Sequence, residues 1–187
     1  MANKDAAFGL KPIGKIGQNR DNQGLSEYDI AASATAIYFQ DPVEMAATGT
    51  ITVAAASDTL LGSLTGVFFT DANTSKPTFA NHLDASNAAT DIKGFVADDP
   101  YERFEVQADG ATAAADVGLN ADIVYAAGSS PDYVSKVELQ TSDQKTGTAQ
   151  LRILGISKDP DNNTAGSANV NLVVMINEHF LKGTTGI

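Results

Sequence analysis

The sequence has no cysteine and no tryptophan, few basic residues, and no apolar run near the roughly 20 residues that a membrane-spanning helix needs. Without cysteine, disulfides, thiolate metal sites and a cysteine nucleophile are excluded. The first 20 residues also lack the apolar stretch of a secretory signal, so we expect neither export nor membrane association. A chain of 187 residues can bury enough surface to form one stable domain without cross-links.

Basic residues are scarce and unevenly placed. The chain holds 12 basic and 23 acidic residues, which gives a formal net charge of −11. Residues 1–20 contain Asp5 as their single acidic residue, against four basic ones: Lys4, Lys11, Lys15 and Arg20. The acidic remainder would repel a phosphate backbone, so we do not expect nucleic-acid binding. A basic segment on an acidic body suits contact with another copy of the chain or with an acidic protein neighbour.

Residues 1–24 predict an extended N-terminal arm, distinct from a β domain over residues 25–187. Glycine recurs every few residues in this arm, and its large apolar side chains are too few to offset the entropy of ordering it alone. We expect the arm to be ordered only against a protein surface, either its own body or, as we favour, a neighbouring subunit. The residues predicted to make that contact are Phe8, Leu10, Lys11, Pro12, Ile13, Lys15, Ile16 and Arg20.

From residue 25 onward the sequence shows the two-residue periodicity of β-strands. The last alternating run carries apolar residues on both faces, so Val173 and Met175 are predicted to lie at a subunit contact. Short runs separated by Gly, Pro, Asn and Asp favour an all-β fold, a single antiparallel β-barrel or sandwich-like domain. The alanine-rich residues 112–117, followed by Gly118, predict one short helical turn. The alternating runs are residues 50–53, 103–107, 136–140, 150–153 and 169–177.

Side chains that often carry chemistry do not form a recognisable motif. His82 and His179 lack the spacing of a zinc site, and we expect both to lie at the surface. There is no GxSxG sequence, and Asp98 and Asp99 are adjacent, so they would point to opposite faces of a strand. Residues 159–163 resemble a calcium loop but lack its glycine and glutamate. We therefore expect a non-catalytic protein without cofactor or metal.

Four segments carry turn and packing signatures that extend over most of the chain. They are AAFGLKPIG (6–14), TLLG with GVFFTD and SKPTF (59–62, 66–71 and 75–79), GFVADDPYERFEVQ (94–107) and LVVMINEH (172–179). In this order they resemble small structural proteins encoded beside the major capsid protein in marine tailed bacteriophages. The resemblance implies a head decoration, or cement, protein that is made in the host cytoplasm. Such a protein binds the outside of the capsid lattice, in contact with the major capsid protein, as a dimer or trimer.

Two other functions stay open. The chain could be another virion component, such as a tail or head–tail connector subunit. It could also be a carbohydrate-binding β-sandwich module, which would need exposed aromatic platforms for sugar rings. The candidates for such platforms are Tyr28, Tyr38, Tyr101, Tyr125 and Tyr133.

Overall fold

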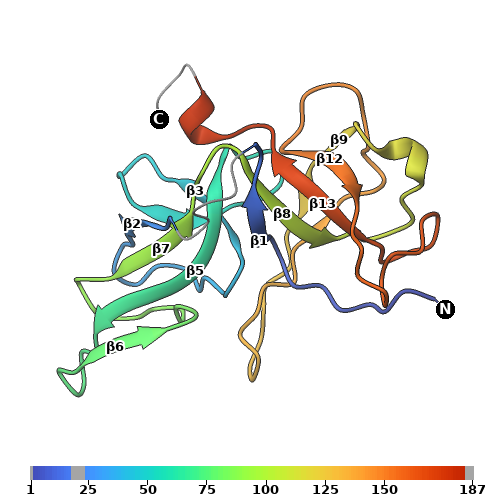
Figure 1. The fold of residues 1–187 in the computed structure, drawn as a ribbon. Helices are drawn as coiled ribbons and strands as arrows, with labels where there is room; N and C mark the ends of the chain where they lie inside the picture. Colours follow the sequence, from blue (N-terminus) through green and yellow to red (C-terminus); the bar gives the residue numbers. More distant parts are fainter. Residues whose placement is uncertain (1, 18–23, 184–187) are drawn as a thin grey trace.

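The structure is a computed structural model that describes residues 2–17 and 24–183 (Figure 1). These residues form two main β-sheets that lie beside each other, each with antiparallel strand pairing. The prediction of an all-β antiparallel fold is therefore confirmed. Both main sheets are open, and no sheet within the described ranges closes into a barrel. The same residues include no helix with the length and apolar character that a membrane crossing requires.

The five-stranded sheet has the strand order β1-β8-β13-β12-β9. Next to it, β10 (Ile123–Val124) and β11 (Glu138–Leu139) form a small two-stranded sheet that contributes buried side chains to the same hydrophobic core. Phe104 of β8 and Val174 of β13 are fully buried at the centre of this first core. The strands of the sheet are β1 (Lys11–Lys15), β8 (Glu102–Gln107), β13 (Asn171–Ile176), β12 (Leu151–Ile156) and β9 (Asn120–Ala121).

The six-stranded sheet has the order β2-β7-β5-β3-β4, with β6 paired to β5. Its second core includes the fully buried Leu64, Val67 and Val96. Each fully buried side chain of this kind stabilises the fold by about 1.5–3 kcal/mol. Each half of the molecule has its own cluster of such side chains, and each cluster contributes to stability. The strands are β2 (Ser26–Asp29), β7 (Lys93–Ala97), β5 (Leu60–Thr70), β3 (Pro42–Met45), β4 (Ile51–Val53) and β6 (Pro77–Ala80).

The chain passes from one sheet to the other where β7 leads through residues 98–101 into β8 (Figure 1). A second link lies near the C-terminus, where Leu60 of β5 forms a β-bridge with His179. His179 then begins the 3-10 helix η2 (Phe180–Lys182), and Phe180 packs against the second core. The two sheets are thus joined by chain crossings at the same end of the molecule.

The alternating runs predicted as strands appear as β4, β8, β11, β12 and β13. Leu172, Val174 and Ile176 are buried, as the period of two requires for one covered face. The alanine-rich stretch forms the single-turn 3-10 helix η1 (Ala114–Asp116), and Gly118 follows it with a φ of +98°. That backbone conformation favours glycine, which explains why the turn ends there.

Candidate protein-binding surface

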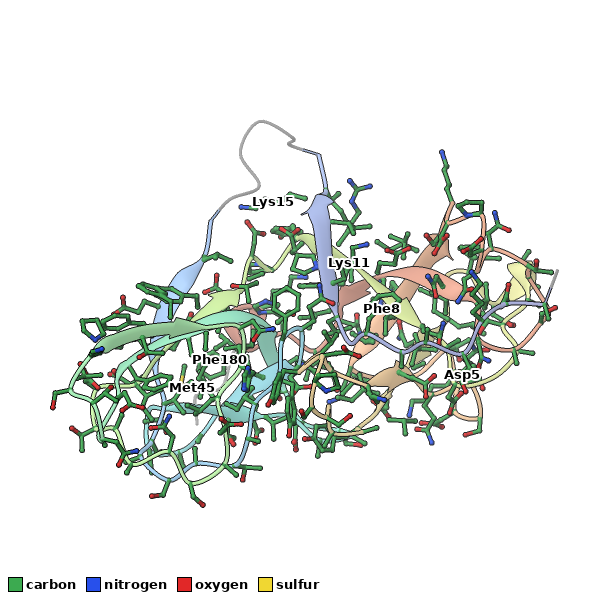
Figure 2. The ribbon with its side chains drawn as sticks, turned by 90° about the horizontal axis from the view of Figure 1, so that it is seen from below. Asp5, Phe8, Lys11, Lys15, Met45 and Phe180 are labelled. Atoms are coloured by element: carbon green, nitrogen blue, oxygen red, sulfur yellow. The ribbon has the colours of Figure 1, made fainter. Side chains whose placement is uncertain are left out.

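The N-terminal segment, residues 2–17, lies against its own chain (Figure 2). Residues 11–15 form the edge strand β1, which pairs with β8. Leu10 also bonds to the half that contains the six-stranded sheet. Its amide donates to the Gln40 carbonyl at 2.9 Å, and its carbonyl accepts from the Ser63 hydroxyl at 2.6 Å. The sequence leaves two surfaces open for the predicted arm, its own body or a neighbouring subunit. In the structure, residues 2–17 pack on their own body. The segment contacts both halves and ties them together.

Leu10 anchors this segment rather than contacting a partner. Its side chain is fully buried in the first core. The neighbouring Gly9 has a φ of +76°, and a Cβ at this position would clash with the Gln40 carbonyl and the Ser135 side chain. Only glycine fits this close approach, so the chain can enter the core at this point. Leu10 is therefore a core residue, unlike the partner contact that the sequence predicts.

The basic side chains of the segment that the structure describes are neutralised within the chain. Each lies within ion-pair distance of a carboxylate on the acidic body, which removes much of the charge that a separate arm would present to a partner. The pairs and their N–O distances are Lys4–Asp161 (2.6 Å), Lys11–Glu105 (3.2 Å) and Lys15–Asp99 (2.9 Å). Arg20, the fourth predicted basic residue, lies outside the described residues.

Lys11 of the arm and Val173 of the last strand, predicted separately, lie on one face of the five-stranded sheet. Lys11 on β1 is opposite Glu105 on β8, and Glu105 is opposite Val173 on β13. Residues directly opposite each other in a sheet point to the same side, so these three side chains form one row. The Ser157 hydroxyl bonds the Glu105 carboxylate, which also holds Lys11. This row links the N-terminal segment to the predicted subunit contact.

A second row lies beside the first on the same face. Arg103 of β8 is opposite Met175 of β13, and Met175 is opposite Arg152 of β12. Arg103 Nε donates to the Gly14 carbonyl at 3.4 Å, and Arg152 Nε donates to Asn120 Oδ1 at 3.1 Å. Val173 and Met175 are both half-buried. We call this surface the β13 face and define it as Lys11, Arg103, Glu105, Arg152, Val173 and Met175.

The other predicted contact residues are spread around β1. Ile13 and Ile16 are 41% and 45% exposed, whereas Phe8 and Pro12 are half-buried. The Lys11 ammonium lies 6.0 Å from the centre of the Phe8 ring. Ile13 sits at a β-bulge between Pro12 and Gly14, which displaces it from the regular ladder. Of the predicted arm residues that the structure describes, Ile13, Ile16 and Lys11 are thus the most accessible to a partner.

Periodicity alone does not predict an aromatic groove on the outer side of the six-stranded sheet. Phe79 on β6 is 75% exposed, with its ring 4.8 Å from that of Phe68 and 6.0 Å from that of Phe95, measured between centroids. The groove has a volume of about 360 Å³. We call it the Phe79 groove. Its lining residues are Leu25, Thr65, Gly66, Phe79, Ala80, Asn81 and Phe95. The hairpin turn at residues 71–76, which brings Phe79 opposite Phe68, is the local signal that could have located it.

A third accessible surface lies where β1 ends. The Ile16 amide donates to the Tyr101 carbonyl at 3.0 Å, and the Lys182 ammonium lies 4.8 Å from the centre of the Tyr101 ring. Tyr101 is 60% exposed and Leu181 is 51% exposed. Burial, and then the charge of Arg152, lower the pKa of Lys182. We call Ile16, Tyr101, Leu181 and Lys182 the Tyr101 surface.

The prediction that both histidines lie at the surface is wrong. His179 is 2% exposed: its Nδ1 accepts from the Leu181 amide, and its Nε2 has no hydrogen-bond partner. Burial lowers the pKa of His179 to about 4, so the ring is neutral at pH 7. The His82 side chain is 15% exposed and stacks on Tyr133 at 3.8 Å between ring centroids. Both rings are held by packing that sequence spacing does not reveal.

Asp41 is a second buried titratable group. It is fully buried, and Oδ2 accepts from the Tyr38 amide at 2.8 Å while Oδ1 has no partner. Burial raises its pKa to about 6. Within residues 2–17 and 24–183, no group of three or more His, Asp or Glu side chains is arranged to hold a metal ion. We therefore interpret Asp41 and His179 through their effect on folding stability.

The five tyrosines proposed as sugar platforms are dispersed. Tyr28 donates to Asp98 at 2.6 Å, and Tyr125 packs against the first core. Of the five, Tyr101 is the exposed one, and the others are half-buried. Phe79, which sequence reasoning does not select for binding, is more exposed than any of them.

Comparison of the chain with protein-family models, with curated protein sequences and with solved structures found no match.

Proposed function

We propose that the protein is a non-catalytic structural component of a virus particle, a capsid decoration protein that binds the outer surface of the major capsid protein lattice. The observation that carries this proposal is the β13 face. It joins Lys11 of the predicted arm to the predicted contact residues Val173 and Met175 in adjacent rows of one sheet.

The charge of the β13 face favours an acidic protein partner. Met175 lies between Arg103 and Arg152, whereas Val173 is opposite Glu105, which pairs with Lys11. The positive charge of the face therefore comes from its two arginines. The chain as a whole carries a net charge of −11, so a cationic surface is a local exception. Complementary charge directs encounter and orientation, while apolar side chains at the centre supply most of the affinity. Such a surface suits docking on an acidic shell.

The sheet also supplies rigidity. The side chains of the β13 face come from β1, β8, β12 and β13, whose backbones are fixed by antiparallel ladders. A surface that is already ordered loses little conformational entropy when it binds. The N-terminal segment contributes by holding β1 at the edge of this sheet, anchored through Leu10. In the proposed role it shapes the binding face rather than wrapping around a neighbouring subunit.

Binding to capsid shells tests the proposal. The chain is mixed with shells assembled from the major capsid protein of its proposed virus, and the bound fraction is measured by sedimentation. We expect the wild-type chain to sediment with the shells and Met175→Asp to lose this binding, because a carboxylate would replace the apolar centre of the face. Met175→Leu should retain binding. Val117→Asp is the matched control, since Val117 is 41% exposed and lies outside the β13 face.

Circular dichroism first establishes that each variant is folded. Equal sedimentation of wild type and a folded Met175→Asp variant would reject the β13 face as the binding surface. If the wild-type chain does not sediment with the shells, the decoration role itself is wrong. Electron microscopy of native particles then distinguishes the capsid exterior from the tail or the head–tail connector, which are the alternative virion locations.

A further inference from the structure

The Phe79 groove is an apolar surface that the chain leaves uncovered. Phe79 is 75% exposed and Leu25 is 48% exposed, while Phe95 forms the floor in stacked contact with Phe79. Stacked rings already hold fixed positions, so filling the groove orders little further. Exposed apolar surface around a groove of about 360 Å³ is typical of a contact site for another protein.

The charge beside the groove is acidic. Glu27 on β2 is directly opposite Phe95 on β7, so its side chain lies on the same face as the groove. Asp29 is two residues along the same strand and points to the same side. Both carboxylates contact the single Lys93 ammonium, at 3.3 and 2.7 Å, which leaves an excess of negative charge. An occupant of the groove should therefore be apolar and should carry a cation.

The Tyr101 surface has this character. Tyr101 and Leu181 are both more than half exposed, and Ile16 lies beside Tyr101. Lys182 holds its ammonium over the Tyr101 ring, and no carboxylate of the described residues lies within ion-pair distance of it. A partner carboxylate would give this cation a counter-charge next to an aromatic contact. The two surfaces are therefore complementary in charge, and both are apolar.

One molecule cannot bring the two surfaces together. Figure 1 shows β6, which carries Phe79, at the lower left of the molecule and η2, which carries Leu181 and Lys182, at the top. We propose that copies of this chain associate head to tail, with the Tyr101 surface of one copy docked in the Phe79 groove of the next. Such a contact joins different surfaces of identical chains, so it forms a closed ring or an open chain of copies.

This contact is independent of the proposed capsid role. Val173 and Met175, the apolar centre of the β13 face, belong to neither surface. Arg152 at the edge of the β13 face acts electrostatically on Lys182 of the Tyr101 surface, but the apolar centre of the face would stay outside the contact. The two proposals can fail separately, because self-association is measured without capsid shells.

The mass of the purified full chain in solution tests the contact. We expect wild type to form oligomers whose population grows with protein concentration. Phe79→Asp should weaken association roughly tenfold or more, because it places a carboxylate in the groove beside Glu27 and Asp29. The double variant Tyr101→Ser with Lys182→Glu should weaken it similarly from the other side. Val117→Asp, which changes an exposed apolar residue outside both surfaces, should associate like wild type.

Mixing the two interface variants distinguishes a head-to-tail contact from a symmetric one. The Phe79→Asp chain keeps an intact Tyr101 surface, and the double variant keeps an intact groove. An equimolar mixture should therefore form one-to-one heterodimers and nothing larger, as native mass spectrometry can resolve. If the double variant alone still dimerises like wild type, the groove binds its own kind and the proposal is overturned. A wild-type chain that is monomeric up to millimolar concentration overturns it too, and Leu25→Ser replaces Phe79→Asp if that variant does not fold.

Discussion

The outer faces of the two sheets differ in how they leave apolar side chains exposed. On the five-stranded sheet, Val173 and Met175 are half-buried, and Met175 lies between the cationic Arg103 and Arg152. On the six-stranded sheet, Phe79 projects with three-quarters of its surface exposed next to an acidic edge. One chain thus presents a cationic surface and an acidic aromatic one. The difference indicates two contacts with different chemistry, an acidic partner on one sheet and a cationic, apolar partner on the other.

The N-terminal segment contacts both halves of the molecule. Leu10→Ala should therefore lower the free energy of unfolding more than any other variant proposed. Leu10 is fully buried in the first core, while its backbone bonds Gln40 and Ser63 in the other half. We expect the free energy of unfolding in urea to fall by about 2–5 kcal/mol, as for other large-to-small core substitutions. Ile16→Ala, at a 45% exposed position, should change it by less than about 0.5 kcal/mol. A similar small change for Leu10→Ala would show that the segment is not part of the core.

The chain also contains two buried groups that titrate, Asp41 and His179, and they act on stability in opposite directions. The pKa of Asp41 is raised by burial from 3.8 to about 6. The folded chain therefore holds this proton more tightly, and the free energy of unfolding falls as the pH rises from about 4 to 6. The pKa of His179 is lowered by burial from 6.5 to about 4. The folded chain holds that proton less tightly, so the free energy of unfolding rises over about pH 4 to 6.5.

A variant that lacks one of the two groups should show the pH dependence of the free energy of unfolding that the other group causes. In the wild type the two slopes offset each other. Asp41→Asn should leave stability rising between pH 4 and 6.5, with a gain over wild type of about 3 kcal/mol at pH 7, where the buried charge is gone. His179→Gln should leave stability falling between pH 4 and 6. Urea unfolding at several pH values measures both. Parallel pH profiles for the two variants would contradict this account.

The sequence predicts the strands where one face is covered and fails where tertiary contacts decide. β13 (Asn171–Ile176) alternates, with Leu172, Val174 and Ile176 buried, because a half-covered sheet requires that pattern. Leu60–Leu64 of β5 is buried at every position, so its period is hidden. His179 looked like a surface residue because nothing local shows that a bridge to Leu60 covers it.

Of the six residues of the β13 face, the sequence predicts Lys11, Val173 and Met175 as contact residues, and it predicts neither the other three nor the geometry that joins them. The sequence predicts Lys11 as part of an arm and Val173 as part of a strand, on separate grounds. Their place in one row depends on β8 lying between β1 and β13. That order joins segments far apart in the sequence, which periodicity cannot establish. Leu10 was assigned to a partner because a short glycine-rich segment cannot show which surface covers it.

A substitution in the Phe79 groove should have the smallest effect on the free energy of unfolding, in contrast to Leu10→Ala in the core. Phe79 contacts Phe68 and Phe95, and aromatic pairs of this kind contribute about 0.5–1.5 kcal/mol. Because the ring is 75% exposed, Phe79→Ala should lower the free energy of unfolding by about 1 kcal/mol or less. The same variant should weaken self-association and leave sedimentation with capsid shells unchanged. A loss of several kcal/mol in urea unfolding would mean that Phe79 holds β6 in the fold, and loss of shell binding would place both contacts on the same surface.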